Sequence, residues 1–428
     1  MAEICPFCGV RYNLEIVKDM ASVICPPYDV ISKDEQKAYY EKSPYNIIRL
    51  EHAMELPDDS DNDNRHTRAS ATLNQWLKDR VLVTDHVPSL YIHEQTFTYQ
   101  GVRKRRLGFT ACVRLEPWEK RMVLPHENTV AGIKSDRLDL MRACNANFSP
   151  LFGLYEDPGQ KIAKLLSVQT SRKPALDFAT DGEVHRLWVA SEPEFIQRIS
   201  HFLAPKPIYI ADGHHRYETA LAYQSEKRQH SPYFSGHEAF NFVMMTLVSF
   251  SDSGLLVLPV HRVVRGISTE DIDRFAKELA AVFDIESLPI ENATKMPEIR
   301  GAIARMVGLK KGFITGLKLR PDVHVKTLMP RDHSDAYNKL EVNILQHLVL
   351  DKLTAIESGV SIAYTPNAEA AVNMVDRGDY QLAFILNPIA LSAIKAVADA
   401  NDRMPGKSTY FYPKLPTGLV INLLEGTL

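Results

Sequence analysis

Cysteine is scarce in this chain. Only five of the 428 residues are cysteines, an odd number: Cys5, Cys8, Cys25, Cys112 and Cys144. A structural zinc ion needs four ligands, and no second Cys-x-x-Cys pair accompanies the one at the N-terminus. We therefore expect reduced thiols that mostly pack inside the protein, with neither disulfides nor a zinc site.

Long hydrophobic runs are also missing. No uninterrupted apolar stretch approaches the ~20 residues that cross a bilayer. The first residues, Met-Ala-Glu-Ile-Cys-Pro, lack the basic and apolar regions of a signal peptide. These observations predict a cytoplasmic protein with no membrane partner.

The chain has no excess of positive charge. Its 50 Lys and Arg against 53 Asp and Glu give a net charge of −3, which argues against general affinity for polyanions. One basic cluster, Arg103-Lys104-Arg105-Arg106, could contact nucleic acid or polyphosphate, but such a cluster more often guards a strand edge or forms a solvated face. We expect no nucleic-acid partner. Neither a Gly-x-x-x-x-Gly-Lys-Ser/Thr motif nor a protein-kinase signature is present, so any nucleotide site is unconventional.

The composition, 45% apolar and 24% charged residues, is typical of a globular protein. A chain of 428 residues is long enough to form two or three hydrophobic cores. Residues 1–115 are expected to form an N-terminal extension with a β-hairpin, whose strands 90–99 and 102–115 turn at Gln100-Gly101. Residues 116–266 and 267–428 are expected to form two further domains. Strands alternating with helices predict an α+β fold containing an α/β C-terminal domain.

Local patterns predict several elements within these domains. Ser32 and Glu35 have the spacing of a capping box, which predicts a helix over about 33–41. An amphipathic helix is predicted over 269–284, with Ser268 or Thr269 as its cap. The C-terminal domain should also contain a helix at about 340–353, a strand over 380–386 and a helix at about 389–400.

The stretch from Pro207 to Leu221 carries the strongest signal for a site. A run of β-formers ends in Asp212-Gly213, and apolar residues with helical spacing begin at Tyr217. The pattern predicts a strand, a tight turn and a helix. The first N–H groups of such a helix lack partners within it, and the helix dipole makes that end electropositive, so anions bind there.

The residue types at this turn suit phosphate chemistry. Gly213 lets the backbone approach a ligand, and Arg216 offers a bidentate fork for phosphate. His214 and His215 could donate to phosphate oxygens or shuttle protons, and Asp212 could hold Mg²⁺ or a substrate amine. Alternatively, these polar residues could simply cap the helix and solvate an ordinary strand-to-helix turn. We favour an anion site, because two histidines and an arginine on one turn repel each other when charged unless an anion relieves them.

Two other stretches offer candidate groups. Glu127 follows Pro125-His126 where the chain leaves a predicted strand, a place where a carboxylate could face a cleft. The loop from Met404 to Lys414 places Lys407, Ser408 and Thr409 together, and these could grip a substrate carboxylate or close over a phosphate donor. Near the N-terminus, three charged residues could line a site or simply pair on the surface: Asp29, Arg49 and Glu51.

Taken together and in this order, four segments resemble the DUF1015 family: Pro26 to Ile31, Pro125-His126-Glu127-x-Thr129, Asp212 to Tyr217, and Met404 to Lys414. The family label implies no activity.

A more distant resemblance does imply one. Free serine kinases, which contain a ParB/sulfiredoxin-like domain, carry a Pro-His-Glu, then a strand ending in Asp-Gly-His-His-Arg, and later a Pro-Lys-Thr-Thr loop. The similar segments here are Pro125 to Glu127, Asp212 to Arg216, and Pro405 to Thr409. The resemblance implies a ParB-like phosphate-binding domain over 116–266. The chain departs from the pattern at Ser408. Its predicted hairpin and the Asp-rich loop over 55–66 have no counterpart in those kinases.

The resemblance also implies roles, with the active site in the cleft between the ParB-like and C-terminal domains. Glu127 would be the base on a serine hydroxyl. The other implied assignments are: catalytic, Asp212, His214 and His215; phosphate and donor binding, Gly213, His215, Arg216 and Lys407; substrate binding, His126, Thr129, Lys407, Ser408 and Thr409; Mg²⁺, Asp212.

We therefore predict a magnesium-dependent kinase that phosphorylates free L-serine or a close analogue, with ATP, ADP or diphosphate as donor. The chain could form a homodimer. A first alternative uses the same site in reverse, as a phosphoserine phosphatase or reverse phosphotransferase. A second is a non-enzymatic, nucleotide-responsive, ParB-like DNA-binding protein, which the acidic net charge and the lack of a helix-turn-helix pattern disfavour.

Overall fold

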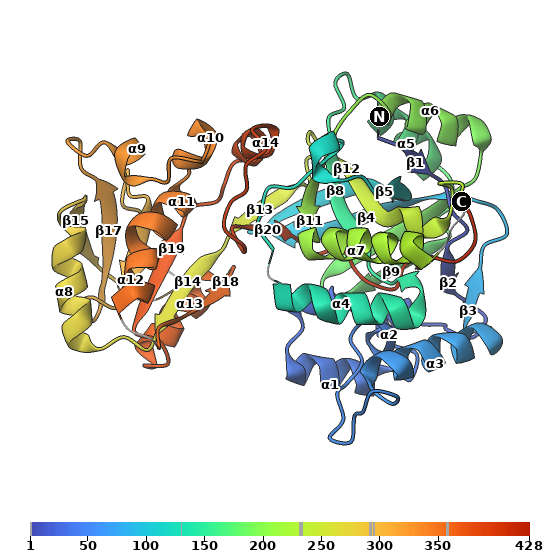
Figure 1. Cartoon of the computed structure of the whole chain (residues 1–428), viewed down its shortest axis with the longest axis horizontal. Coiled ribbons are helices and arrows are strands. Elements are labelled where there is room, and N and C mark those ends of the chain that lie inside the picture. The colour runs from blue at the N-terminus through green and yellow to red at the C-terminus, as the bar shows by residue number, and fades with distance from the viewer. Residues whose placement is uncertain (1, 130, 231–233, 291–292, 294–295, 357–358) are drawn as a thin grey trace. The chain divides into compact units, whose positions relative to one another are not determined.

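The computed structural model describes residues 2–129, 131–230, 234–290, 293, 296–356 and 359–428. By its internal contacts the chain divides into two compact units. The first unit comprises Met1–Pro125, Thr129–Leu255 and Pro413–Leu428, and the second comprises His126–Asn128 and Leu256–Tyr412 (Figure 1). The chain is a mixed α/β protein, as predicted. The three-domain division at residues 115 and 266 stays a prediction.

A nine-stranded mixed sheet organises the described part of the first unit. Eight strands follow the order β6-β11-β8-β12-β5-β4-β10-β9, and β1 pairs with β5. Their bounds are β1 Ile4–Cys5, β4 Leu90–Tyr99, β5 Val102–Arg114, β6 Val123–Leu124, β8 Leu151–Tyr155, β9 Leu176–Thr180, β10 Glu183–Ala190, β11 Ile208–Asp212 and β12 Phe242–Ser249. Two small sheets pair β2 Val10–Tyr12 with β3 Leu82–Thr84, and β7 Ala146–Asn147 with β21 Asn422–Leu423.

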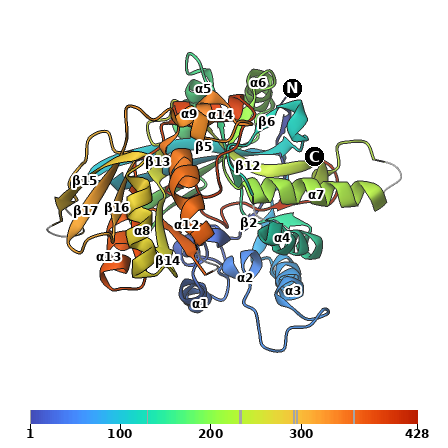
Figure 2. The ribbon, with the colours of Figure 1, turned by 60° about the vertical axis from the view of Figure 1, so that its left-hand side comes forward.

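The helices of the first unit are α1 Lys33–Lys42, α2 Ile48–Glu51, α3 Arg65–Lys78, α4 Ala131–Cys144, α5 Lys161–Thr170, α6 Pro193–Leu203 and α7 His214–His230. Helices α4 and α7 lie side by side, as Figures 1 and 2 both show. The predicted capping box is confirmed, since Ser32 Oγ accepts from the N–H of Glu35, whose carboxylate accepts from the N–H of Ser32.

The predicted hairpin is confirmed as β4 and β5, with Tyr99 opposite Val102. Gln100 and Gly101 both have positive φ, 49° and 76°, as a two-residue hairpin turn requires. The hairpin does not stand apart as an extension, because β5 also pairs with β12. Within the basic cluster, Arg106 is buried and donates to the backbone O of Pro413 at 2.8 Å, so the expectation of a solvated face was wrong for this residue.

The second unit is built on a six-stranded sheet of order β15-β17-β16-β19-β14-β18 and a two-stranded ribbon β13-β20. The strands are β13 Leu256–Pro259, β14 His261–Arg265, β15 Phe283–Pro289, β16 Ala304–Val307, β17 Phe313–Leu319, β18 Ser361–Thr365, β19 Leu382–Leu386 and β20 Thr409–Tyr412. The helices are α8 Thr269–Leu279, α9 Val325–Leu328, α10 Asp335–Asn338, α11 Glu341–Leu345, α12 Asp351–Ile356, α13 Ala368–Asp376 and α14 Leu391–Asp399.

Two helix predictions in this unit needed correction. The helix predicted over 269–284 begins as expected, with Ser268 as its cap, but ends at Leu279, and Phe283 opens strand β15. The apolar residues Val282 and Phe283 continue the helical spacing and are also good strand formers, so the pattern could not place the boundary. The helix predicted over 340–353 is interrupted by a π-helical turn at Gln346–Leu350, between α11 and α12. The strand at 380–386 and the helix at 389–400 are confirmed as β19 and α14.

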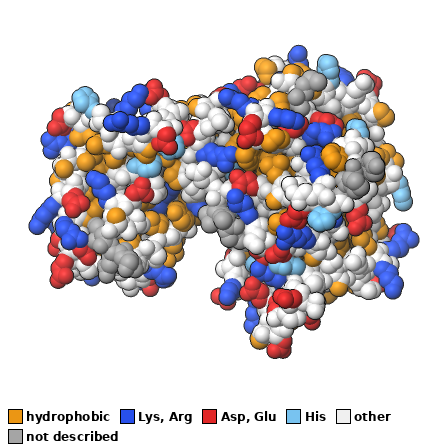
Figure 3. All heavy atoms as spheres, in the orientation of Figure 1, with side chains coloured by type: hydrophobic (Ala, Val, Ile, Leu, Met, Phe, Trp, Pro, Cys, Tyr) orange, Lys and Arg blue, Asp and Glu red, His pale blue; other side chains and the backbone are white. Residues whose placement is uncertain are grey.

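Separate hydrophobic cores support the units. In the first unit, Leu90 and Ile92 belong to one buried cluster while Tyr91 between them belongs to another, which reflects the alternation of a strand covered on both faces. The core of the second unit gathers around Val263, Ile314 and Ile385. On the face shown in Figure 3, Lys and Arg side chains are interspersed with Asp and Glu over both units. Among the described residues, no helix is both long and apolar enough to span a membrane.

Candidate functional site

The strand-turn-helix predicted at Asp212 to Tyr217 is present in the first unit. Strand β11 ends at Asp212, Gly213 makes the turn, and α7 begins at His214. Gly213 has φ 95°, which L side chains rarely adopt, and its backbone O accepts the N–H of Tyr217 at 3.0 Å. The N-terminus of a 17-residue helix, with its first N–H groups that have no partner inside the helix, therefore lies at this corner.

Arg216 lies in the first turn of α7 and is held by several hydrogen bonds. Its Nη1 donates to Ser149 Oγ at 3.0 Å and to the backbone O of Pro150 at 2.7 Å, and its Nη2 donates to Asp212 Oδ2 at 2.9 Å. Burial lowers the pKa of Arg216, but Asp212 and Asp29 outweigh this effect and leave the pKa raised. Arg216 is thus a fixed cation beside the turn.

Asp212 sits between two cations. Its Oδ2 accepts from Arg216, and its Oδ1 accepts from Lys414 Nζ at 2.6 Å. Lys414 ends the loop that begins at Met404, and the sequence alone indicates no role for it. Because 202 residues separate it from Asp212, no local pattern could have paired them.

Mg²⁺ does not fit Asp212 as the side chain stands. Both carboxylate oxygens already accept hydrogen bonds from cations, and these two cations would repel a further positive charge. Within the described residues, no three or more His, Cys, Asp and Glu side chains gather in a way that could hold a metal. The assignment of Asp212 as a metal ligand stays a prediction, and no chemical step below is derived through the ion.

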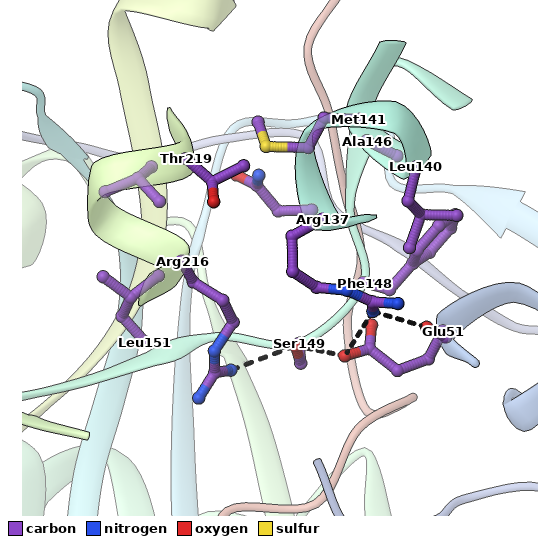
Figure 4. Close-up of a pocket in the computed structure, with 12 residues that line it drawn as sticks. Glu51, Arg137, Leu140, Met141, Ala146, Phe148, Ser149, Leu151, Arg216 and Thr219 are labelled. Atoms are coloured by element: carbon purple, nitrogen blue, oxygen red, sulfur yellow. Dashed lines mark hydrogen bonds and ion pairs between the residues drawn. The ribbon is translucent and has the colours of Figure 1, made fainter. Parts of the chain in front are cut away.

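A small cavity lies behind Arg216. Glu51, Arg137, Ser149 and Arg216 line it and form a continuous chain of contacts (Figure 4). Ser149 donates to Glu51 Oε1 at 2.9 Å, and Arg137 donates to the backbone O of Glu51 at 2.7 Å. The cavity offers about 40 Å³ for the centres of water-sized molecules. At the ~10–15 Å³ that one water needs, the cavity has room for a few waters and is too small for a nucleotide.

Glu51 is the buried carboxylate of this network. Burial raises its pKa, against the opposing effects of Arg137, Arg216 and the Ser149 hydroxyl. Of the three N-terminal charged residues that could line a site, Glu51 does so. Arg49 instead donates to the backbone O of Tyr40 at 2.9 Å and stacks over its ring. The network contacts Arg216 through Ser149, which binds Nη1, whereas Asp212 binds Nη2.

Glu127 belongs to the second unit, where backbone groups hold its carboxylate. Oε1 accepts from the Thr409 N–H at 2.7 Å and from its hydroxyl at 2.6 Å, and Oε2 accepts from the Lys407 N–H at 3.1 Å. The backbones also join, because Met404 donates to His126 O at 2.8 Å and Asn128 donates to Met404 O at 2.9 Å. The Pro-His-Glu segment and the 404–409 loop, far apart in sequence, are thus brought together.

The other candidate residues of these two segments are His126, Ser408 and Lys407. His126 is buried, and its Nε2 lies 2.9 Å from Thr409 Oγ1. Since the Thr409 hydroxyl hydrogen goes to Glu127, its oxygen accepts here and the His126 proton is on Nε2. Ser408 is buried and donates to the backbone O of Pro405 at 2.6 Å, which braces the loop. Lys407 is exposed and has a left-handed backbone, φ 61°.

The structure brings the predicted residues together in two groups. Asp212, Gly213 and Arg216 form the corner of the first unit, with His214 buried and His215 half-buried at the helix start. Thr129 joins this unit through Glu218 of α7, to which its hydroxyl donates at 2.5 Å. Glu127, His126, Lys407, Ser408 and Thr409 form the loop group of the second unit. That the two groups share one pocket stays a prediction.

Comparison with known proteins places the chain in a family. Residues 4–343 match the model described as "Protein of unknown function (DUF1015)", and the protein belongs to this family. No curated protein matches the chain. Among solved structures, a mutant free serine kinase in complex with AMP is 14% identical, with a TM-score of 0.38 over 71% of this chain and 88% of that chain.

Two other solved structures are similar to the same degree. A conserved hypothetical protein from Pyrococcus furiosus is 14% identical, with a TM-score of 0.37 over 71% of this chain and 92% of that chain. SbnI with a C-terminal truncation, from Staphylococcus aureus, is 11% identical, with a TM-score of 0.35 over 73% of this chain and 87% of that chain.

Proposed function

We propose that the protein transfers a phosphoryl group from a nucleotide or diphosphate to the hydroxyl of a small amino acid, with free L-serine as the candidate acceptor. One observation carries the proposal. A glycine with positive φ opens helix α7 at a corner where the cations of Arg216 and Lys414 are fixed on either side of Asp212. Helix N-terminal N–H groups between fixed cations suit the equatorial oxygens of a transferring phosphoryl group.

Glu127 is the proposed base. The acceptor oxygen forms a bond to phosphorus, the bond from phosphorus to the leaving oxygen breaks, and the hydroxyl proton passes to the Glu127 carboxylate. Thr409 and Lys407 hold that carboxylate through three hydrogen bonds, which fixes its orientation before the acceptor arrives.

That the two groups of candidate residues share one active site stays a prediction. The cytoplasmic location, the homodimer and the ParB-like identity of residues 116–266 stay predictions.

The test is an activity screen of ATP, ADP and diphosphate against L-serine and related hydroxyl compounds, with wild type and Glu127→Gln. Amide substitution keeps the size of the side chain but removes the base, so we expect turnover to fall about 10²- to 10⁴-fold. Glu41→Gln, on the exposed face of α1, is the matched control and should keep full activity.

Two outcomes contradict the proposal. A fully active Glu127→Gln enzyme would remove Glu127 from the chemistry. Rapid orthophosphate release from O-phosphoserine, with no nucleotide or diphosphate present, would establish the phosphatase alternative in place of the kinase.

A further inference from the structure

A buried arginine in the second unit, Arg262 on β14, has no assigned role. Its side chain is 1% exposed. Nη1 donates to the backbone O of Val260. Among the described residues, Nε and Nη2 have no hydrogen-bond partner. A buried charged group with unmade hydrogen bonds is costly to a fold, so its presence calls for a reason.

The two unpartnered nitrogens are neighbours. Nε–H and Nη2–H point from the same edge of the planar guanidinium, while Nη1, which contacts Val260, lies on the other side. This edge is the one that binds a carboxylate or phosphate through two parallel hydrogen bonds. The two donors of Arg262 that have no partner among the described residues are therefore the pair suited to bind an oxyanion.

The surroundings of Arg262 favour a ligand there. In the sheet it lies opposite Tyr364 on β18 and Phe384 on β19, and its guanidinium is 5.5 Å from the centre of the Tyr364 ring. Glu127 is close enough to act on it electrostatically. An arginine edge and a carboxylate within electrostatic range of each other suit a small ligand that carries both an anionic group and a hydrogen-bond donor.

We propose that the Nε and Nη2 edge of Arg262 binds an oxyanion of the substrate, and that this oxyanion is the carboxylate of the acceptor amino acid. A phosphate group could accept the same two hydrogen bonds from this edge. We assign the carboxylate because the fixed cations that suit phosphate, Arg216 and Lys414, belong to the other group of candidate residues. The inference deepens the proposed function and rests on it for the identity of the acceptor.

Binding measurements on the full-length protein test this inference without relying on turnover. Calorimetric titrations would compare L-serine, serinol, which lacks the carboxylate, and inorganic phosphate. The proteins are wild type, Arg262→Lys and Arg262→Met, with Arg265→Met as the matched control, because Arg265 is exposed on the same strand. We expect the affinity for L-serine to fall at least tenfold in both Arg262 variants and to be unchanged in Arg265→Met. Serinol should bind wild type and variants alike.

Thermal unfolding separates binding from a structural role. A structural arginine would lower the melting temperature of the ligand-free protein when replaced. An arginine retained for a ligand should leave the melting temperature of Arg262→Met unchanged or higher, since two unsatisfied buried donors are removed.

Three results would overturn the inference: equal L-serine affinity in wild type and Arg262→Lys, loss of phosphate affinity without loss of L-serine affinity, or a large drop in the melting temperature of Arg262→Met. Failure of the proposed function looks different. In that case no phosphoryl transfer is found, while Arg262-dependent binding of L-serine persists.

Discussion

Two arginines that are largely shielded from solvent, Arg216 in the first unit with an 11% exposed side chain and Arg262 in the second at 1%, differ in the partners that meet their charge. Arg216 donates to Ser149, Pro150 and Asp212, and its pKa is raised because nearby carboxylates outweigh burial. For Arg262, burial lowers the pKa to about 10, and Tyr364 and Glu127 offset this only in part. The partners of Arg216 fix its charge in place at the proposed phosphate site. Two donors of Arg262 have no partner among the described residues, which costs stability and calls for a ligand.

The largest expected loss of stability comes from removing the carboxylate that pairs with Arg216. Asp212→Asn leaves Arg216 and Lys414 without their carboxylate, and all three side chains are only 10–19% exposed. Removing one partner of such a pair should lower the free energy of unfolding by about 2–4 kcal/mol. All three tryptophans of the chain, Trp76, Trp118 and Trp188, belong to the first unit, so denaturant unfolding followed by tryptophan fluorescence reports on it.

The matched control is an exposed pair. Asp322, which pairs with Arg320 at 3.1 Å, is 68% exposed. Asp322→Asn should cost much less than Asp212→Asn, measured by far-UV circular dichroism because this pair lies in the second unit. Equal costs for the two substitutions would mean that burial of the Asp212 pair contributes nothing.

The next largest effect is a pH dependence of the unfolding free energy of the second unit, which arises from His261, the residue before Arg262. Burial, together with the charges of Arg262 and Arg305, lowers the pKa of His261 to about 4. The unfolded value is about 6.5, so protons bind the unfolded chain more tightly. The stability that neutral His261 contributes is complete above pH 6.5 and is lost as the pH falls toward 4, by at most about 3 kcal/mol.

Unfolding of wild type and His261→Gln by far-UV circular dichroism, from pH 7 to pH 4, measures this contribution. The difference in unfolding free energy between the two proteins should shrink as the pH falls, because Gln does not titrate. Adding Arg262→Met should weaken the trend, since one cause of the low pKa is removed. His324→Gln, at an exposed histidine of the same unit, is the matched control. A constant difference for His261→Gln would contradict the prediction.

Local sequence patterns were sufficient for the backbone of the corner but not for its partners. The change from β-formers to helical spacing located β11, the turn and α7, because both periods are local properties of the chain. The pairing of Asp212 with Lys414 and the bracing of Arg216 by Ser149 depend on sheet order, which brings distant segments together. No local pattern singles out Arg262, because what distinguishes it is two donors that have no partner within the described part of the folded chain.

The smallest effect concerns the glycine at the corner. Gly213 and Gly101 both have positive φ, 95° and 76°, so alanine at either position strains the backbone. A Cβ at Gly101 would meet nothing within 4 Å, whereas one at Gly213 would lie 3.0 Å from Arg216 Nη2 and 3.1 Å from its Nε. Gly213→Ala should therefore cost about 1 kcal/mol more than Gly101→Ala in tryptophan-monitored unfolding.

Nucleotide binding should separate the two variants further. Gly213→Ala pushes against the guanidinium beside the helix N-terminus, so we expect weaker binding of ADP by calorimetry, while Gly101→Ala at the hairpin tip should bind as wild type does. If both alanines cost the same and both variants bind ADP equally well, Arg216 yields without loss. In that event the partners of Arg216 do not fix it in place, and the contrast with Arg262 would rest on Arg262 alone.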